Sequence, residues 1–227
     1  MAGLEERLEK LTLRLDHLGM RVEQAFTDAW RAVERGDVEA GNKVDADDAI
    51  IDREEIEIEQ ECIRLLALYQ PAAIDLRTIC TIIKTNNDLE RIADLAASMG
   101  RRVRHVVGVG LTVAEYPRLL SLKQDTSEVL GLTIRLLSHR NAKVAHTVIE
   151  NDQRIDDAYS DLVQSVLRAE DQHVGGAEVA MTLINLAKAF ERIGDLCTNI
   201  AEDLIFLATG DIVRHAHAFG GPDDDEG

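Results

Sequence analysis

Apolar residues near the start of the chain recur at the spacing of a long amphipathic helix. The steps alternate between four and three residues, and the positions are Leu4, Leu8, Leu11, Leu15, Leu18, Val22, Ala25 and Ala29. This period keeps the apolar side chains on one face, which packs against other helices. The pattern predicts a helix that ends near Gly36.

Similar patterns predict five further long helices. They span approximately residues 37–68, 72–104, 117–139, 141–169 and 177–207. The sequence Tyr69-Gln70-Pro71 predicts the turn that ends the second helix, and Pro117 suits the first turn of the fourth. The segment 105–115, with two glycines, interrupts the pattern between the two sets of three helices.

The second set of helices repeats the first. The segment LERIAD at residues 89–94 returns as FERIGD at residues 190–195, which is 101 positions later. In the second and fifth helices, five positions match at an offset of 104: Val44, Asp48, Ile51, Asp52 and Ile58 with Val148, Asp152, Ile155, Asp156 and Leu162. We therefore predict an all-α fold of two tandem antiparallel three-helix bundles. The expected boundaries are 1–107 and 115–215, followed by an acidic disordered tail at 216–227.

The composition narrows the classes of function. With 42 acidic and 25 basic residues the formal net charge is −17, which disfavours binding to a phosphate backbone, so no nucleic-acid partner is expected. No apolar run approaches the ~20 residues of a membrane span, and the charged first sixteen residues do not resemble a signal peptide. The three cysteines, Cys62, Cys80 and Cys197, lack metal-site spacing and are expected to be reduced core thiols. Together these features predict a cytoplasmic protein.

Acidic residues interrupt the apolar face of four helices. Each of these helices carries two carboxylates four residues apart, on one face: Asp48 and Asp52, Glu90 and Asp94, Asp152 and Asp156, Glu191 and Asp195. In the first hairpin, both Asp52 with Glu90 and Asp48 with Asp94 centre on residue 71. In the second hairpin, the corresponding pairs centre between residues 173 and 174. Residues equidistant from a short turn lie at the same height, so four carboxylates are expected to meet in each hairpin.

Converging carboxylates repel one another unless a positive charge lies between them. Because oxygen ligands favour hard ions, we predict that these eight residues bind magnesium, calcium, manganese or iron. One alternative is a solvated face in which Arg91, Arg192 or nearby lysines neutralise the acids, as in a purely structural helical scaffold. Another is a di-iron-type oxidase, but such enzymes use two Glu-x-x-His pairs. This chain has that spacing once, at Glu170 and His173.

Several motifs resemble the PhoU family of phosphate-signalling regulators over roughly residues 4–215. In the first repeat they are QPAAIDLR at 70–77 and NDLERIAD at 87–94. In the second they are FERIGD at 190–195, the segment from Asn199 to Glu202, and TGDIVRH at 209–215.

The resemblance implies a non-enzymatic cytoplasmic adaptor, often a homodimer, that represses the phosphate-starvation response. Such adaptors link the ATPase of the phosphate ABC transporter to a membrane sensor histidine kinase, and so lie at the inner face of the membrane through their partners. A paralogous adaptor for another transporter is the alternative within the family. Family members bind metal clusters, including iron, at motifs that correspond to the eight carboxylates above.

The two repeats differ at positions near these motifs. Ala93 replaces the usual glycine of the ERIGD motif, Ser98 corresponds to Asn199, and Arg101 corresponds to Glu202. If Asn199 or Glu202 contributes to a metal or partner site, the two halves are expected to bind differently.

Overall fold

The computed structural model describes residues 2–139, 141–168 and 176–210, and this part of the chain is helical without strands. The elements are α1 (Ala2–Arg35), α2 (Val38–Tyr69), α3 (Ala73–Gly108), a short 3-10 turn η1 (Val113–Glu115), α4 (Pro117–His139), α5 (Ala142–Leu167) and α6 (Ala177–Thr209). The six helices predicted from the apolar pattern are confirmed. The predicted tail at 216–227 and the Glu170–His173 pair lie outside the described residues.

Local side-chain chemistry explains where the helices begin and end. The Asp37 carboxylate accepts a hydrogen bond from the backbone N–H of Ala40, and Asn141 accepts one from Lys143, so both cap the N-terminus of a helix. Gln70 adopts a left-handed conformation after α2 and Gly210 does so after α6. Pro117 is the first residue of α4, as predicted.

The third helix is longer than the sequence pattern predicted. It was expected to end near Arg104 but continues to Gly108. Val103 and Val106 are buried, so the apolar face persists beyond the arginine-rich segment. The chain leaves the helix just before Gly110, whose φ of +71° favours glycine.

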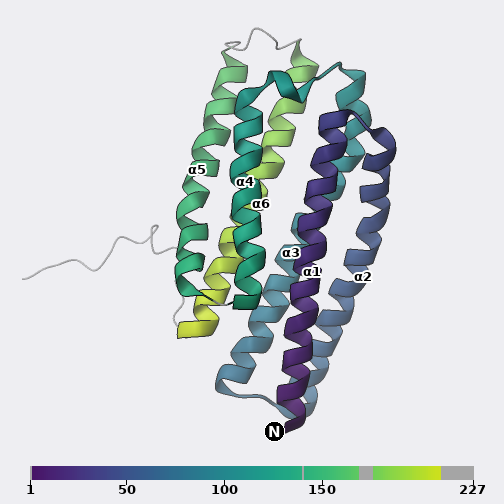
Figure 1. Ribbon diagram of the computed structural model, residues 1–227. Coiled ribbons are helices and arrows are strands. Elements are labelled where there is room, and N and C mark those ends of the chain that lie inside the picture. Colours follow the sequence, from purple (N-terminus) through teal and green to yellow (C-terminus); the bar gives the residue numbers. More distant parts are fainter. Residues whose placement is uncertain (1, 140, 169–175, 211–227) are drawn as a thin grey trace, which may run out of the picture.

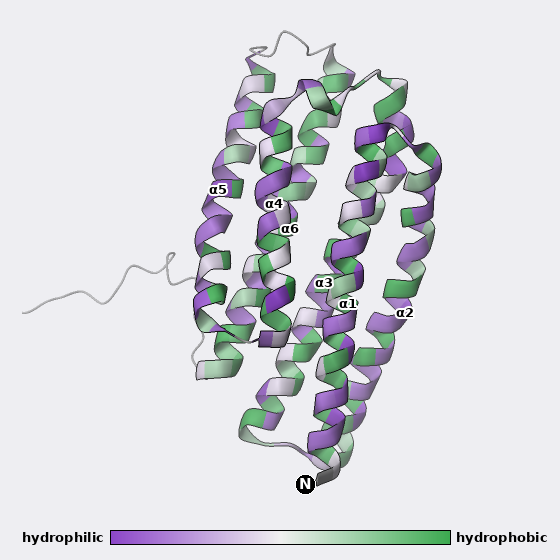
Figure 2. Cartoon of the chain, in the orientation of Figure 1, coloured by the Kyte–Doolittle hydropathy of each residue, from purple (hydrophilic) through white to green (hydrophobic). Residues whose placement is uncertain are grey.

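The six helices form two three-helix bundles that lie side by side (Figure 1). In the first bundle α1, α2 and α3 all contact one another, and in the second α4, α5 and α6 do the same. The bundles meet where α3 packs against α6 and α1 packs against α4. This arrangement confirms the tandem three-helix architecture. The helices are polar on one side and apolar on the other (Figure 2), and within the described residues none is long and apolar enough to cross a lipid bilayer.

The core extends without interruption from one bundle into the other. Phe190 of α6 makes edge-to-face contacts with Phe26 and Trp30 of α1, with ring centroids 6.0 Å and 5.6 Å apart. All three rings are buried. The two repeats therefore share aromatic packing.

The cysteines are free, and two of the three lie in the core as predicted. Cys62 and Cys197 are buried, and burial raises the pKa of each thiol to about 12. Cys80 is only partly buried, whereas its neighbours Ile79 and Thr81 on α3 are buried. The two buried thiols are therefore protonated and unreactive near neutral pH.

Candidate carboxylate clusters

Each repeat places four of the predicted carboxyl groups on facing helices of a hairpin. We call Asp48, Asp52, Glu90 and Asp94 the first cluster; these residues lie on α2 and α3. We call Asp152, Asp156, Glu191 and Asp195 the second cluster; these lie on α5 and α6. In both hairpins the apolar neighbours along the helix face, such as Ile51 and Ile155, are buried. The buried neighbours fix the rotation of α2 and α5 and hold Asp48 and Asp152 at the edge of the core.

In the second cluster, three carboxyl groups converge closely. One oxygen each from Asp152, Asp156 and Asp195 lies within 4.8 Å of the others, and among the described residues this is the only group of three or more acidic, histidine or cysteine side chains so arranged. The fourth member, Glu191, forms an ion pair with Lys188 one helical turn away. Glu191 Oε2 is buried and makes no hydrogen bond.

Gly194 allows Asp152 to lie against α6. A β-carbon at position 194 would stand 2.6 Å from Asp152 Oδ1. The corresponding residue of the first repeat is Ala93, so the close approach of aspartate to helix backbone belongs to the second repeat. The departure from the ERIGD motif noted in the sequence thus coincides with a difference in how the two clusters are built.

The acidity of the second cluster is depressed by burial and mutual repulsion. Burial raises the pKa of Asp152 to about 6, with smaller effects from the three other carboxylates, while the nearby Thr198 hydroxyl lowers it. Burial followed by Glu191 raises the pKa of Asp195 and that of Asp156. These groups are therefore harder to ionise than isolated aspartates, and a bound cation would relieve the repulsion.

In the first cluster the carboxyl groups act on one another without the same close convergence. Burial, followed by repulsion from Asp52 and Asp94, raises the pKa of Asp48 to about 6. Burial and then Asp94 raise the pKa of Glu90. The two helices thus bring the four predicted carboxyl groups close enough to affect one another's ionisation.

Two residues that were not predicted as ligands extend the first cluster. Glu55 has its pKa raised by burial, by Glu59 and by Asp52. Asn86 is fully buried, and its amide nitrogen donates to the backbone oxygen and to Oε1 of Glu55, each at 3.0 Å. The sequence spacing could have indicated this role. Asn86 lies four residues before Glu90 and Glu55 lies three after Asp52, so each is on the same helix face as a predicted ligand.

Neutralisation by nearby basic residues is realised only in part. Arg91 pairs with Asp88 at 3.5 Å, and Arg101 pairs with Asp45 at 2.5 Å; neither acid belongs to a cluster. Lys188 does pair with a cluster member and also lies 5.2 Å from the centre of the Tyr159 ring. Neutralisation by a salt bridge, the alternative to metal binding, is therefore observed for one member of the second cluster, Glu191.

A groove of about 540 Å³ between α3 and α6 connects the two halves. Asp94 of the first cluster and Asp195 of the second both line it, together with Arg91, Arg101 and Arg192. The two clusters thus open toward the same groove.

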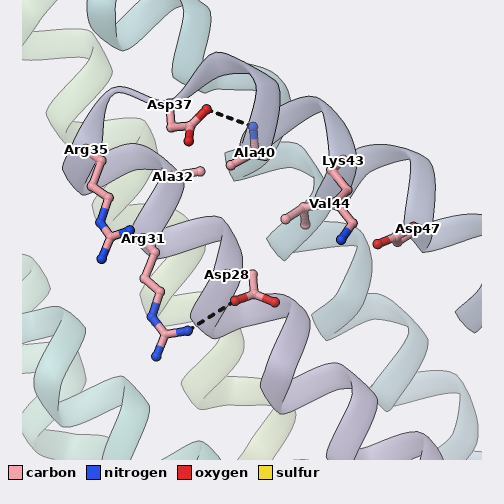
Figure 3. A pocket seen from close by; sticks show the side chains of 9 residues that line it. All are labelled: Asp28, Arg31, Ala32, Arg35, Asp37, Ala40, Lys43, Val44 and Asp47. Atoms are coloured by element: carbon pink, nitrogen blue, oxygen red, sulfur yellow. Dashed lines mark hydrogen bonds and ion pairs between the residues drawn. The ribbon is translucent and has the colours of Figure 1, made fainter.

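A second cavity, of about 320 Å³, lies at the turn between α1 and α2 (Figure 3). Three of its charged residues have local structural roles: Arg31 pairs with Asp28 at 3.4 Å, and Asp37 caps α2. No member of either carboxylate cluster lines it. We therefore place the candidate site at the carboxylate clusters.

The donor set of both clusters fits a hard cation. The members are carboxylates, and Asn86 adds an amide oxygen, Oδ1, that is buried and makes no hydrogen bond. Such ligands suit magnesium, calcium, manganese or iron.

Comparison with known proteins gives consistent matches along the chain. The family model described as the PhoU domain matches residues 15–103 and again residues 119–204. The phosphate-specific transport system accessory protein PhoU homolog of Rhizobium meliloti is 34% identical over 215 residues, which cover 92% of this chain and 89% of that protein. The phosphate-specific transport system accessory protein PhoU of Edwardsiella tarda is 30% identical, covering 95% and 87% respectively.

A solved structure agrees with the fold. The crystal structure of PhoU from Pseudomonas aeruginosa superimposes with a TM-score of 0.85 at 29% identity and covers 91% of this chain and 99% of that one. The likeness therefore includes the arrangement of both bundles.

Proposed function

The chain belongs to the PhoU domain family, and from this premise we propose that it is a non-enzymatic negative regulator of phosphate uptake and of the phosphate-starvation response. The observation that supports this proposal most strongly is the length over which the chain aligns with its relatives. Relatives named as accessory proteins of phosphate-specific transport align with more than nine-tenths of the chain, through both repeats.

The proposed partners are the ATPase subunit of the phosphate ABC transporter and a membrane sensor histidine kinase. The family resemblance supports these partners, and the relatives' names, as accessory proteins of phosphate-specific transport, support the ATPase in particular. In this proposal the protein is a cytoplasmic homodimer, held at the inner face of the membrane by its partners. Contact with the transporter changes the adaptor's conformation and so reports transporter state to the kinase.

We further propose that both carboxylate clusters bind hard metal ions. The close oxygens of Asp152, Asp156 and Asp195 support this assignment, as do the burial and the repulsion that raise the pKa of Asp48 and Asp152. Bound metal neutralises charge at the common groove between α3 and α6. It thereby stabilises the bundles in the form that meets the partners.

A strain lacking this gene tests the regulatory role. Secreted phosphatase activity is measured in ample phosphate, where a negative regulator keeps it low. The deletion strain is expected to show high activity that falls when the intact gene is returned. Activity that stays low in the deletion strain would contradict the proposal and direct attention to the partners of a different transporter.

A double substitution tests metal binding. Asp152→Asn with Glu191→Gln is expected to reduce the manganese retained after dialysis and to reduce the metal-dependent rise in melting temperature, since only the first cluster then binds metal. A site filled at 100 times its Kd stabilises a protein by about 2.7 kcal/mol. The control, Asp161→Asn with Glu178→Gln, removes two exposed carboxylates from the same helices and should keep both properties. Unchanged metal content and melting temperature in the cluster variant would instead support a purely structural scaffold.

A further inference from the structure

The second cluster contains a basic side chain of its own. Lys188 lies on α6 one turn before Glu191, and its ammonium group pairs with that carboxylate. The same group lies over the Tyr159 ring of α5 at 5.2 Å, which fixes it between the two helices. Its side chain is 44% exposed, so it reaches the cluster from the solvent side.

The first cluster has no such lysine. The offset of 101 residues that relates the repeats places Asn87 where the second repeat has Lys188, and Asn86 where it has Ala187. In place of Tyr159, the first repeat has the additional carboxylate Glu55, which is hydrogen bonded to buried Asn86. The first cluster therefore has more oxygen donors and lacks a lysine.

The arginines near the clusters do not remove this difference. Arg101 acts on Asp48, but its guanidinium is paired with Asp45 at 2.5 Å, and Asp45 lies outside the cluster. Arg91 and Arg192 occupy equivalent positions in the two repeats and line the same groove. Lys188 is therefore a basic residue that forms an ion pair inside its cluster, whereas Arg101, which stands where the second repeat has Glu202, forms its ion pair outside the first cluster.

We propose that Lys188 is a built-in counter-ion that competes with metal for the second cluster, so that the two repeats differ in their affinity for hard divalent cations. This inference rests on the proposed metal binding. A cation that binds Asp152, Asp156 and Asp195 is repelled by the Lys188 ammonium beside Glu191. Glu191 can become a ligand only when its ion pair with Lys188 breaks. The first cluster fills at lower metal concentration because, among the described residues, the nearby Arg91 and Arg101 form their ion pairs with acids outside the cluster and no carboxylate has to be released from a basic partner.

Exchange of the two equivalent residues tests the proposal. Each cluster is studied alone in a protein whose other cluster is disabled. Asp52→Asn with Glu90→Gln disables the first cluster, and Asp152→Asn with Glu191→Gln disables the second. Lys188→Asn is made in the protein that retains the second cluster, and Asn87→Lys in the protein that retains the first. Free Mn²⁺ is followed by electron paramagnetic resonance as the metal is titrated.

The expected result is a reciprocal change in affinity. Lys188→Asn should tighten Mn²⁺ binding about tenfold, because it removes a repulsion of about 1.4 kcal/mol between the ammonium group and the metal ion. Asn87→Lys should weaken binding at the first cluster by a similar factor. Lys188→Arg, which keeps the charge, should bind Mn²⁺ more weakly than Lys188→Asn. The control Lys143→Asn removes a lysine nine residues before Asp152 and should leave affinity unchanged.

A measurement without metal separates this inference from the proposed function. In EDTA, Lys188→Asn should lower the urea midpoint because Glu191 loses its counter-ion, and Asn87→Lys should raise it. Wild-type protein that binds no Mn²⁺ would overturn the metal assignment. Wild-type binding with equal affinity and equal urea midpoint in Lys188→Asn would overturn the role of Lys188 alone.

Discussion

At the residue scale, the clusters are defined by acids that occupy positions where the helix would otherwise be apolar. Asp48 follows buried Val44, and Asp152 follows buried Val148, each by one turn. Each aspartate therefore loses hydration and faces other carboxylates, and the pKa of each rises to about 6. An aspartate in an unfolded chain has a pKa near 3.8.

This difference predicts how the stability of the metal-free protein depends on pH. Because the folded pKa is above the unfolded pKa, the folded state binds more protons between pH 4 and 6. The stabilising contribution of the two aspartates is present below pH 4 and is lost as pH rises through 6. Since both groups are partly exposed to solvent, we expect a loss of only about 1 kcal/mol per site.

Urea unfolding in EDTA at pH 5 and pH 7.5 measures this contribution. The variant Asp48→Asn with Asp152→Asn should lose less stability over this interval than the wild type. The control, Asp47→Asn with Asp161→Asn, changes exposed carboxylates of the same helices and should follow the wild type. The same pH dependence in all three proteins would show that these two carboxyl groups are not the titrating groups.

At the scale of the elements, α2 and α3 approach closely where two glycines meet. A β-carbon at Gly41 would lie 2.5 Å from the carbonyl oxygen of Gly100, and one at Gly100 would lie 2.6 Å from that of Gly41. Real β-carbons do not approach a backbone oxygen so closely, so both positions require glycine. The crossing sets the separation of the two helices that carry the first cluster.

Gly41→Ala is therefore expected to force α2 away from α3 and to lower the free energy of unfolding by about 2–4 kcal/mol. Urea denaturation followed by circular dichroism measures the loss. Gly108→Ala is the matched control, because a β-carbon at Gly108 meets nothing within 4 Å. That control should be neutral or slightly stabilising. Equal stability of Gly41→Ala and the wild type would contradict the close crossing.

At the scale of the whole molecule, the two repeats are joined by shared core residues. Phe190 of the second repeat packs against Phe26 and Trp30 of the first, and Lys84 of α3 pairs with buried Asp203 of α6 at 3.1 Å. Such contacts couple the stability of the two bundles. We therefore expect the repeats to unfold together.

Phe190→Ala should lower the free energy of unfolding by about 3–5 kcal/mol and shift the emission of Trp30, the single tryptophan, to longer wavelength. Fluorescence reports Trp30 in the first repeat, while circular dichroism reports both repeats. In the wild type the two transitions should coincide. Phe206→Ala, a change at a partly exposed ring, should cost less and leave the Trp30 emission unchanged. Separate transitions in the wild type would contradict coupling between the repeats.

The accuracy of the sequence-based prediction differed between elements for physical reasons. The starts of α2, α4 and α5 follow from local chemistry at Asp37, Pro117 and Asn141, and were predicted closely. The predicted end of α3 was wrong because the two glycines after Arg104 indicated a break, whereas the fold buries Val106 and the helix continues to Gly108. The roles of Asn86 and Lys188 were not predicted, since each depends on a partner or ring on another helix.

The sequence by itself determined the helices, their order, the internal repeat and the face of each helix that carries carboxylates. These properties depend on spacing along one helix or on symmetry about a turn, which are local. Only the tertiary structure decided that Asp152, Asp156 and Asp195 converge, that Lys188 lies over the Tyr159 ring, and that both clusters open to one groove. The first two features depend on the rotation of α5 and α6 about their axes, and the third depends on packing between the repeats, because side chains distant in sequence meet only when the bundles are assembled.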